Sequence, residues 1–320
     1  MNKKYDTIII DVNNLFMRNY FVYKDDEKFK IKSGKFDFHS GGIYGSLVSL
    51  KKLKREKLKP EGKFIFLADN ATSKVRHRKD IDPEYKANRV KQKKAFYRNI
   101  DFLIRILSHY DNVSKVVQIN DYEADDLVPV AIQQEKFEDS VLLVSSDMDW
   151  SRCIGYEGRD VEWFDGKELI TKGKFLDKYG FDFSEKAIII YKSFHGDDSD
   201  FIPNPVKGLP KKYLIKFTQE DSVEQILLNI NLYGLEDKWV KKIMDSYGRI
   251  LINKELVSFV PVELADFVFN TTFCKFNYKV MKTMFDSLQL PSHLNELFDK
   301  ELKNKMKDKD WFTPMKRKRV

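Results

Sequence analysis

Four continuous apolar runs, rich in β-branched residues, constrain most strongly how this chain of 320 residues can fold. They span residues 7–12, 64–68, 113–119 and 141–144. Such runs are typical of strands buried on both faces of a parallel sheet. Helical spacing recurs between them, first in Ile43, Leu47 and Leu50, then in Phe96, Ile100, Leu103, Ile104 and Leu107. Strands that alternate with helices predict an α/β fold with a mainly parallel central sheet flanked by helices.

Acidic residues follow these runs, and they recur beside Gly196. They are Asp11, Asp69, Glu123, Asp125, Asp126, Asp147, Asp149, Asp197 and Asp200. Each acid alone could cap a helix and complement its dipole. Because ligands of such sheets bind outside the carboxyl ends of the strands, we expect these acids to converge on one edge.

Converging carboxylates favour a metal site. Like charges about 4 Å apart repel by roughly 4 kcal/mol at an effective dielectric near 20, so the group would protonate, move apart or bind cations. Carboxylate oxygens suit Mg²⁺, with Mn²⁺ as a substitute, and paired cations are a common device for cutting phosphodiesters. The sequence therefore predicts a nuclease with two divalent ions.

Charge and composition narrow the function further. The net charge is +8, and residues 72–98 contain ten Lys or Arg against three Asp or Glu, which suits a polyanion bound beside an acidic pocket. Cys153 and Cys274 lie far apart and the five histidines show no metal-binding pairing, which argues against zinc. No apolar run approaches the ~20 residues that span a bilayer. We expect a cytoplasmic protein without a signal peptide, in the host cytoplasm if the chain is viral.

The order of motifs resembles that of the 5′-nuclease superfamily. This superfamily includes flap endonucleases, the 5′–3′ exonuclease domain of bacterial DNA polymerase I and the bacteriophage enzymes called RNase H, and the chain looks most like the phage branch. The motifs are Ile10-Asp11, Ala68-Asp69-Asn70, Tyr85-Lys86-Ala87-Asn88-Arg89, Tyr122-Glu123-Ala124-Asp125-Asp126, Ser145-Ser146-Asp147-Met148-Asp149 and Gly196-Asp197-Asp198-Ser199-Asp200. They cover roughly residues 5 to 215.

The resemblance implies roles for individual residues. Asp11, Asp69, Glu123, Asp125 and Asp147 would form one cation site, and Asp126, Asp149, Asp197 and Asp200 would complete the second. Lys86 and Arg89 would act as catalytic residues on the scissile phosphate. The basic segment 72–98 would form a helical arch over the 5′ single strand, with Arg76, Arg78 and Tyr85 contacting DNA.

The resemblance also implies three regions. A PIN-like nuclease domain would span residues 1–190, a smaller helical domain 191–300, and a basic, flexible tail 301–320. Residues 196–212 resemble the start of the family's helix–turn–helix motif for duplex DNA, where Lys207, Gly208, Lys211 and Lys212 would meet phosphates. Asn204 and Pro210 replace glycines of the family pattern, and Pro205 is inserted. Because proline cannot donate an amide hydrogen, one phosphate contact is lost or moved, and a K⁺ site is in doubt. We also expect helices at residues 211–217, 221–231 and 236–247 and beyond 260.

These observations predict a divalent-metal-dependent 5′-nuclease that acts on 5′ ends, flaps or RNA primers on duplex DNA during replication or repair. We expect a monomer whose partners are DNA with a 5′ flap, nick or RNA primer and a single-strand-binding or other replication protein. Two alternatives stay open. One is a PIN-like endoribonuclease, and the other is a catalytically silent protein that binds DNA junctions.

Overall fold

The computed structural model describes residues 3–33, 36–69, 76–89, 92, 94–289, 300 and 303–304. The chain forms two compact units. Unit 1 consists of Met1–Ala68, Gln92–Gln118 and Phe267–Val320, and unit 2 consists of Asp69–Lys91 and Ile119–Asp266. The domain boundaries predicted from the sequence, at 190 and 300, do not coincide with the limits of these two units and stay a prediction. The predicted tail, 301–320, lies outside the described residues apart from 303–304.

Unit 1 is built around buried parallel strands. β1 (Tyr5–Asp11) pairs in parallel with β4 (Leu58–Leu67), β4 pairs in parallel with β5 (Lys115–Val117), and β9 (Thr271–Phe273) joins β5 as an antiparallel edge. Ile8, Ile9 and Ile10 are fully buried, as expected for a strand covered on both faces. A hairpin of β2 (Lys30–Ser33) and β3 (Phe36–His39) lies apart from these strands, preceded by the short 3₁₀ helix η1 (Glu27–Phe29).

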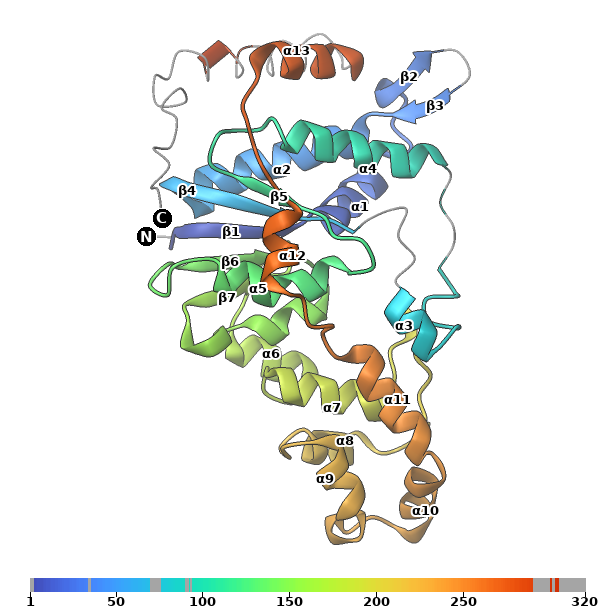
Figure 1. Cartoon of the computed structure of the whole chain (residues 1–320). Coiled ribbons are helices and arrows are strands. Elements are labelled where there is room, and N and C mark those ends of the chain that lie inside the picture. The colour runs from blue at the N-terminus through green and yellow to red at the C-terminus, as the bar shows by residue number, and fades with distance from the viewer. Residues whose placement is uncertain are drawn as a thin grey trace. The chain divides into compact units, whose positions relative to one another are not determined.

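Helices α1 (Val12–Tyr23), α2 (Gly41–Lys57) and α4 (Lys94–Leu107) pack together beside these strands, and α13 (Tyr278–Ser287) follows later in the chain (Figure 1). The two glycines at the start of α2 are buried, and a Cβ on Gly42 would lie 2.7 Å from the ring of Phe16 in α1. These glycines let α1 and α2 approach closely. The predicted apolar stripe of α4 is borne out by the burial of Phe96, Ile100 and Leu103.

Unit 2 has a second set of strands in the order β8-β7-β6. β6 (Val141–Val144) and β7 (Val161–Phe164) are parallel, and β8 (Leu169–Ile170) is an antiparallel edge. Unit 2 also contains the short helices α3 (Arg76–Ile81), η2 (Ala124–Leu127), α5 (Val128–Gln133), η3 (Met148–Cys153), η4 (Tyr156–Gly158) and α6 (Lys172–Tyr179). η2 and η3 begin within the two acidic motifs, residues 122–126 and 145–149.

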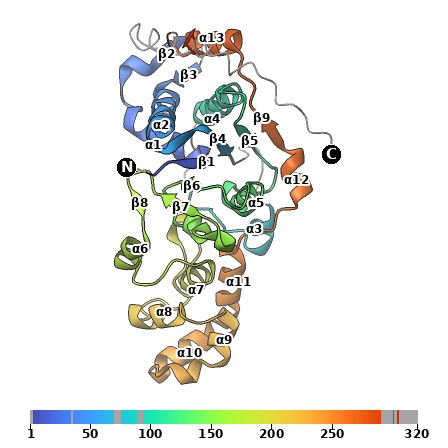
Figure 2. The ribbon, with the colours of Figure 1, turned by 90° about the vertical axis from the view of Figure 1, so that its left-hand side faces the viewer.

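The rest of unit 2 is helical. It consists of α7 (Glu185–His195), η5 (Asp198–Asp200), α8 (Lys211–Phe217), α9 (Val223–Leu228), η6 (Ile230–Tyr233), α10 (Asp237–Asp245) and α11 (Tyr247–Val257). These helices gather together in Figure 2, around a core that includes Ile190, Phe194 and Phe217. α8 matches its predicted bounds, whereas α11 was not predicted. α12 (Leu264–Phe269) leads the chain back into unit 1.

The predicted fold class is confirmed: the chain is α/β, with mainly parallel strands flanked by helices. The helix–turn–helix function of the helical part stays a prediction. Across the described residues, no helix combines the length and the apolar character needed to cross a membrane.

Candidate active site

A tight turn after α7 places two of the predicted acids. Gly196 has φ +78°, and a Cβ there would lie 2.6 Å from the carbonyl oxygen of Ile202, so only glycine fits. Asp197 and Ile202 exchange two main-chain hydrogen bonds of 2.8 Å each, which folds the chain back on itself. Asp197 and Asp200 lie on the loop that this turn closes.

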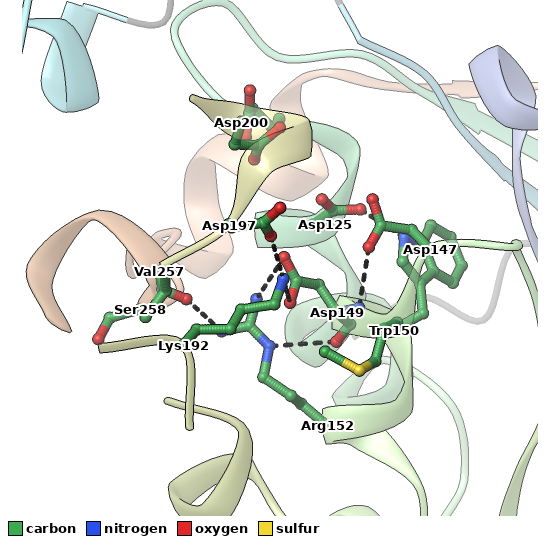
Figure 3. Close-up of polar contacts among 12 residues, drawn as sticks. Asp125, Asp147, Asp149, Trp150, Arg152, Lys192, Asp197, Asp200, Val257 and Ser258 are labelled. Carbon is green, nitrogen blue, oxygen red and sulfur yellow. Dashed lines mark hydrogen bonds and ion pairs between the residues drawn. The ribbon is translucent and has the colours of Figure 1, made fainter. Parts of the chain in front are cut away.

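A second turn, after β6, places Asp147 and Asp149. Asp147 accepts the amide hydrogen of Asp149 at 2.9 Å and thereby caps η3. Trp150, fully buried in the same turn, donates its indole hydrogen to Asp125. Figure 3 shows Asp125, Asp147, Asp149 and Asp197 gathered at this place, although they come from three separate segments of unit 2.

The segment from Tyr85 to Arg89 docks against the same loop. The Lys86 amide donates to the carbonyl of Asp200 at 2.8 Å, and the Asn88 side chain donates to the carbonyl of Asp198 at 2.9 Å. Lys86 has φ +58°, an uncommon conformation for a residue with a side chain. Such strained backbone conformations cluster at functional sites.

The side chains of this segment bind the acids directly. The ammonium of Lys86 pairs with Glu123 and lies 3.4 Å from Asp200, and Arg89 pairs with Asp200 at 2.8 Å. The hydroxyl of Tyr85 lies 3.0 Å from both carboxylates, and its single proton can serve one of them at a time. Lys86 and Arg89 thus lie beside the acids, as the sequence predicts.

Burial and neighbouring charges divide the acids into two kinds. Burial, and then the charge of Glu123, raises the pKa of Asp69; burial, and then Asp149, raises the pKa of Asp147. Burial opposes the charged form of Glu123 and Asp149 too, but Lys86 and Arg78 lower the pKa of Glu123, and Lys192 and Arg152 lower that of Asp149. Neighbouring Lys and Arg side chains therefore stabilise the charged forms of Glu123 and Asp149. Burial and a neighbouring carboxylate destabilise the charged forms of Asp69 and Asp147.

Arg78 and Asp126 form a buried pair. The guanidinium is 3% exposed and donates to both carboxylate oxygens of Asp126, at 2.7 and 2.9 Å, and to Glu123 at 3.2 Å. It also donates to the carbonyls of Leu256, at 2.9 Å, and Ser258, at 3.0 Å. Asp126 also accepts the amide hydrogens of Glu123, at 3.1 Å, and of Val260, at 2.9 Å.

These contacts occupy both side chains and favour a structural role over the predicted ones, which were metal binding for Asp126 and DNA binding for Arg78. The same holds for Tyr85, whose ring is 2% exposed and packs with Ile202, Leu256 and Val257. A ring buried in this way cannot stack on a base without leaving its packing.

Of the remaining predicted residues, Asp69 lies close to Glu123. Asp69 accepts the amide hydrogen of Ala124 at 2.9 Å within unit 2. Asp11 belongs to unit 1, where it caps α1 by accepting the amide hydrogen of Asn14 at 2.9 Å, so its place in the metal site stays a prediction. Lys207, Gly208, Lys211 and Lys212 are all exposed around the start of α8. The side chain of Arg76 lies outside the described residues, as do 72–75, 90, 91 and 93 of the predicted arch.

Two site residues were missed by sequence reasoning, Lys192 and Arg152. Lys192 joins Asp149 to Asp197, as Figure 3 shows, with nitrogen–oxygen distances of 2.6 and 2.7 Å. Arg152 donates to the carbonyls of Asp149, at 3.1 Å, and of Val257, and its guanidinium lies 3.6 Å from the ring centroid of Phe259. The available signal was a lysine among the apolar residues of α7, since Ile188, Ile190 and Phe194 are buried on the same helix.

The candidate ligands suit Mg²⁺ or Mn²⁺, because they are all carboxylates. Burial raises the pKa of two of them, Asp69 and Asp147. Within the described ranges, however, no three Asp, Glu, His or Cys side chains stand arranged to hold an ion. Lysine side chains join several of these acids: Lys86 lies between Glu123 and Asp200, and Lys192 lies between Asp149 and Asp197. A cation that binds there has to compete with these lysines.

Comparison with known proteins gives the class of the chain. Residues 6–180 match the family model described as 5′-3′ exonuclease, N-terminal resolvase-like domain. A 5′-3′ exonuclease of Buchnera aphidicola (subsp. Schizaphis graminum) is 29% identical over 71% of this chain and 75% of its own length. DNA polymerase I of Bacillus subtilis is 26% identical over 93% of this chain, which spans only 33% of that polymerase.

Solved structures agree with the fold. The bacteriophage T5 D15 protein, co-crystallised with metal ions, aligns with a TM-score of 0.58 and 18% identity over 93% of this chain and 98% of its own. A T5 D15 flap endonuclease in a pseudo-enzyme–product complex with DNA and metal ions gives 0.57 and 19%, with the same coverage. The chain belongs to the 5′-3′ exonuclease family of the 5′-nuclease superfamily, and it is a nuclease.

Proposed function

We propose that this chain is a divalent-metal-dependent 5′-nuclease that hydrolyses phosphodiesters at 5′ ends, flaps or RNA primers on duplex DNA. The observation that carries the proposal is the gathering of Asp125, Asp147, Asp149 and Asp197 at one place in unit 2. Two further acids of the same unit, Glu123 and Asp200, are paired with Lys86 and Arg89. Family membership supports the same reaction class. The T5 relatives, which were solved with metal ions and with DNA, support divalent ions and DNA as ligands.

The proposed roles follow from where the residues lie. Asp69, Glu123, Asp125 and Asp147, with Asp11, would hold one ion, and Asp149, Asp197 and Asp200 would hold the other. Bound ions supply the Lewis-acid chemistry that activates water and stabilises the leaving oxygen. Mg²⁺ is proposed as the natural ion because the oxygen ligands suit it, and Mn²⁺ as a substitute.

The chain's own cations would act on the phosphate. Lys86 and Arg89 are paired with carboxylates here, and a phosphate that enters the site offers them an alternative anion. Arg89 is 54% exposed and can reach outward, whereas Lys86 is 14% exposed and stays close to Glu123. We therefore assign substrate capture to Arg89 and charge stabilisation at the scissile phosphate to Lys86.

Duplex DNA would be held by the exposed loop before α8. Lys207, Lys211 and Lys212 are exposed there, and Gly208, with φ +91°, turns the chain between them. Contacts of this type bind phosphates and do not read sequence. We further propose that the protein acts as a monomer in the cytoplasm, with a single-strand-binding or other replication protein as its partner.

Product mapping on three substrates labelled at the 5′ end tests the function: a flap, a nicked duplex and an RNA–DNA hybrid, each with Mg²⁺ and each with EDTA. We expect short 5′-terminal products that end in a 3′-hydroxyl, with the new 5′-phosphate on the downstream strand, and no product in EDTA. Cleavage within single-stranded RNA alone would favour the PIN-like endoribonuclease. Tight binding to the flap without cleavage under any ion would favour a silent junction-binding protein.

A further inference from the structure

The ammonium of Lys192 joins two carboxylates that the proposed function assigns to the second ion. It lies 2.6 Å from Asp149 and 2.7 Å from Asp197, and its side chain is 6% exposed. Asp149 reaches this point from η3, whereas Asp197 directly follows Gly196 at the end of α7. The lysine therefore joins two segments that are 48 residues apart by number, from 149 to 197.

Because Lys192 and its two ion pairs are buried, they have a large effect on the energy of the site. Two buried carboxylates that face each other repel strongly, and a buried ammonium without a partner is also unfavourable. Together the three groups carry one net negative charge, whereas the two acids alone would carry two. The two ion pairs, at 2.6 and 2.7 Å, stabilise the ammonium of Lys192 against its burial.

Other groups around Asp149 cannot take over this task. Arg152 lies 3.7 Å from the far oxygen of Asp149, and it is committed to the carbonyls of Asp149 and Val257 and to the ring of Phe259. Lys86 serves a separate pair, Glu123 and Asp200. Among the described residues, Lys192 is the cation whose ion pairs reach both Asp149 and Asp197.

We propose that Lys192 is a positioning residue that acts as an internal counterion for Asp149 and Asp197. It keeps the two carboxylates together when no divalent ion is bound, and it lowers their affinity for an ion by supplying a positive charge of its own. Ion binding at this pair then depends on the added negative charge of a bound phosphate. The inference rests on the proposed function for the identity of the site.

The main test compares Lys192→Met with Lys186→Met. Methionine keeps most of the length of the stem and removes the charge. Lys186 lies on the same helix, but its pair with Asp221 is exposed, at 49% and 82%, which makes it a matched control. Two measurements need no substrate: the melting temperature in EDTA and the calorimetric titration of each protein with Mn²⁺ alone.

We expect Lys192→Met to melt at a lower temperature than wild type in EDTA, and Mn²⁺ to restore its melting temperature. Its weaker Mn²⁺ site should tighten by about tenfold or more, because a unit charge a few ångströms away has been removed. Lys186→Met should match wild type in both measurements. Unchanged melting in EDTA together with unchanged Mn²⁺ affinity, or a weaker affinity in Lys192→Met, overturns the proposal.

A double variant separates charge from packing. Lys192→Met with Asp197→Asn restores one net negative charge at the pair, so it should melt above Lys192→Met in EDTA, even if the single variant does not fold there. If the double variant is no more stable than the single one, Lys192 fills space only and the proposal fails. If wild type binds no Mn²⁺ and cleaves nothing, the proposed function fails, while melting in EDTA still decides the role of Lys192.

Discussion

Replacing Arg78 by methionine tests the buried framework of the site. Arg78 is 3% exposed, and its nitrogens bind both oxygens of Asp126, one oxygen of Glu123 and the carbonyls of Leu256 and Ser258. Removing one partner of a buried ion pair costs about 3–5 kcal/mol, because the remaining charge stays buried without compensation. The variant also leaves two carbonyls without this donor, so we expect a loss at the upper end of that range.

Urea denaturation followed by tryptophan fluorescence is a suitable assay. Trp150 and Trp163 are fully buried in unit 2, so their emission reports the unfolding of the part that contains Arg78. Lys79→Met, on the exposed side of the same short helix, is the matched control and should stay within about 0.5 kcal/mol of wild type.

A double-mutant cycle with Asp126→Asn assigns the loss to the pair. The two substitutions should be non-additive by about 0.5–3 kcal/mol, as is usual for residues in direct contact. If Arg78→Met unfolds within about 0.5 kcal/mol of wild type, the pair does not hold the site together, and the structural role assigned to Arg78 and Asp126 is refuted.

Two further predictions concern the same unit. Gly196→Ala should destabilise the turn by at least about 1–3 kcal/mol, because a Cβ would lie 2.6 Å from a backbone oxygen at φ +78°; equal stability in urea would contradict the close approach. Partial burial opposes ionisation of Asp82, but Arg249 and the amide of Glu84 hold its pKa below the ordinary 3.8. A carboxylate whose pKa is lowered by folding stabilises the fold at pH values above its unfolded pKa, and this contribution is lost as the pH falls through the folded pKa. The stability advantage of wild type over Asp82→Asn should therefore be constant near neutrality and shrink below about pH 4. An advantage that grows on acidification would refute this assignment.

Four strands could be located from the sequence because a strand that is buried on both faces is a continuous apolar run. β6 has the predicted bounds, whereas β1 begins two residues and β4 six residues before the predicted start, and β5 covers only 115–117 of the predicted run 113–119. α11 was missed because Ser246 alone separates it from α10, and the nearby glycine, Gly248, lies inside α11 rather than between the two helices. That omission matters, because the carbonyls of Leu256, Val257 and Ser258 at the end of α11 are the ones that Arg78 and Arg152 bind.

Within the site, sequence identified the acids better than their partners. Asp125 and Asp126 are adjacent, and the sequence pattern does not distinguish them. In the structure, however, Asp125 accepts a hydrogen bond from Trp150 and Asp126 binds Arg78. Lys192 and Arg152 are single cations in helical segments, and such residues usually face solvent. Their burial depends on acids and carbonyls that only the tertiary fold brings near them, so the periodicity of the sequence could not reveal it.

The central claim is that these acids carry out hydrolysis, and Asp147→Asn tests it most directly. Cleavage of a 5′-labelled flap with Mg²⁺ is measured beside binding of the same flap in EDTA, for the variant and for wild type. Cleavage should be lost while binding persists, since the substitution removes one carboxylate charge and leaves the exposed lysines before α8 in place. Cleavage by Asp147→Asn at the wild-type rate would contradict it.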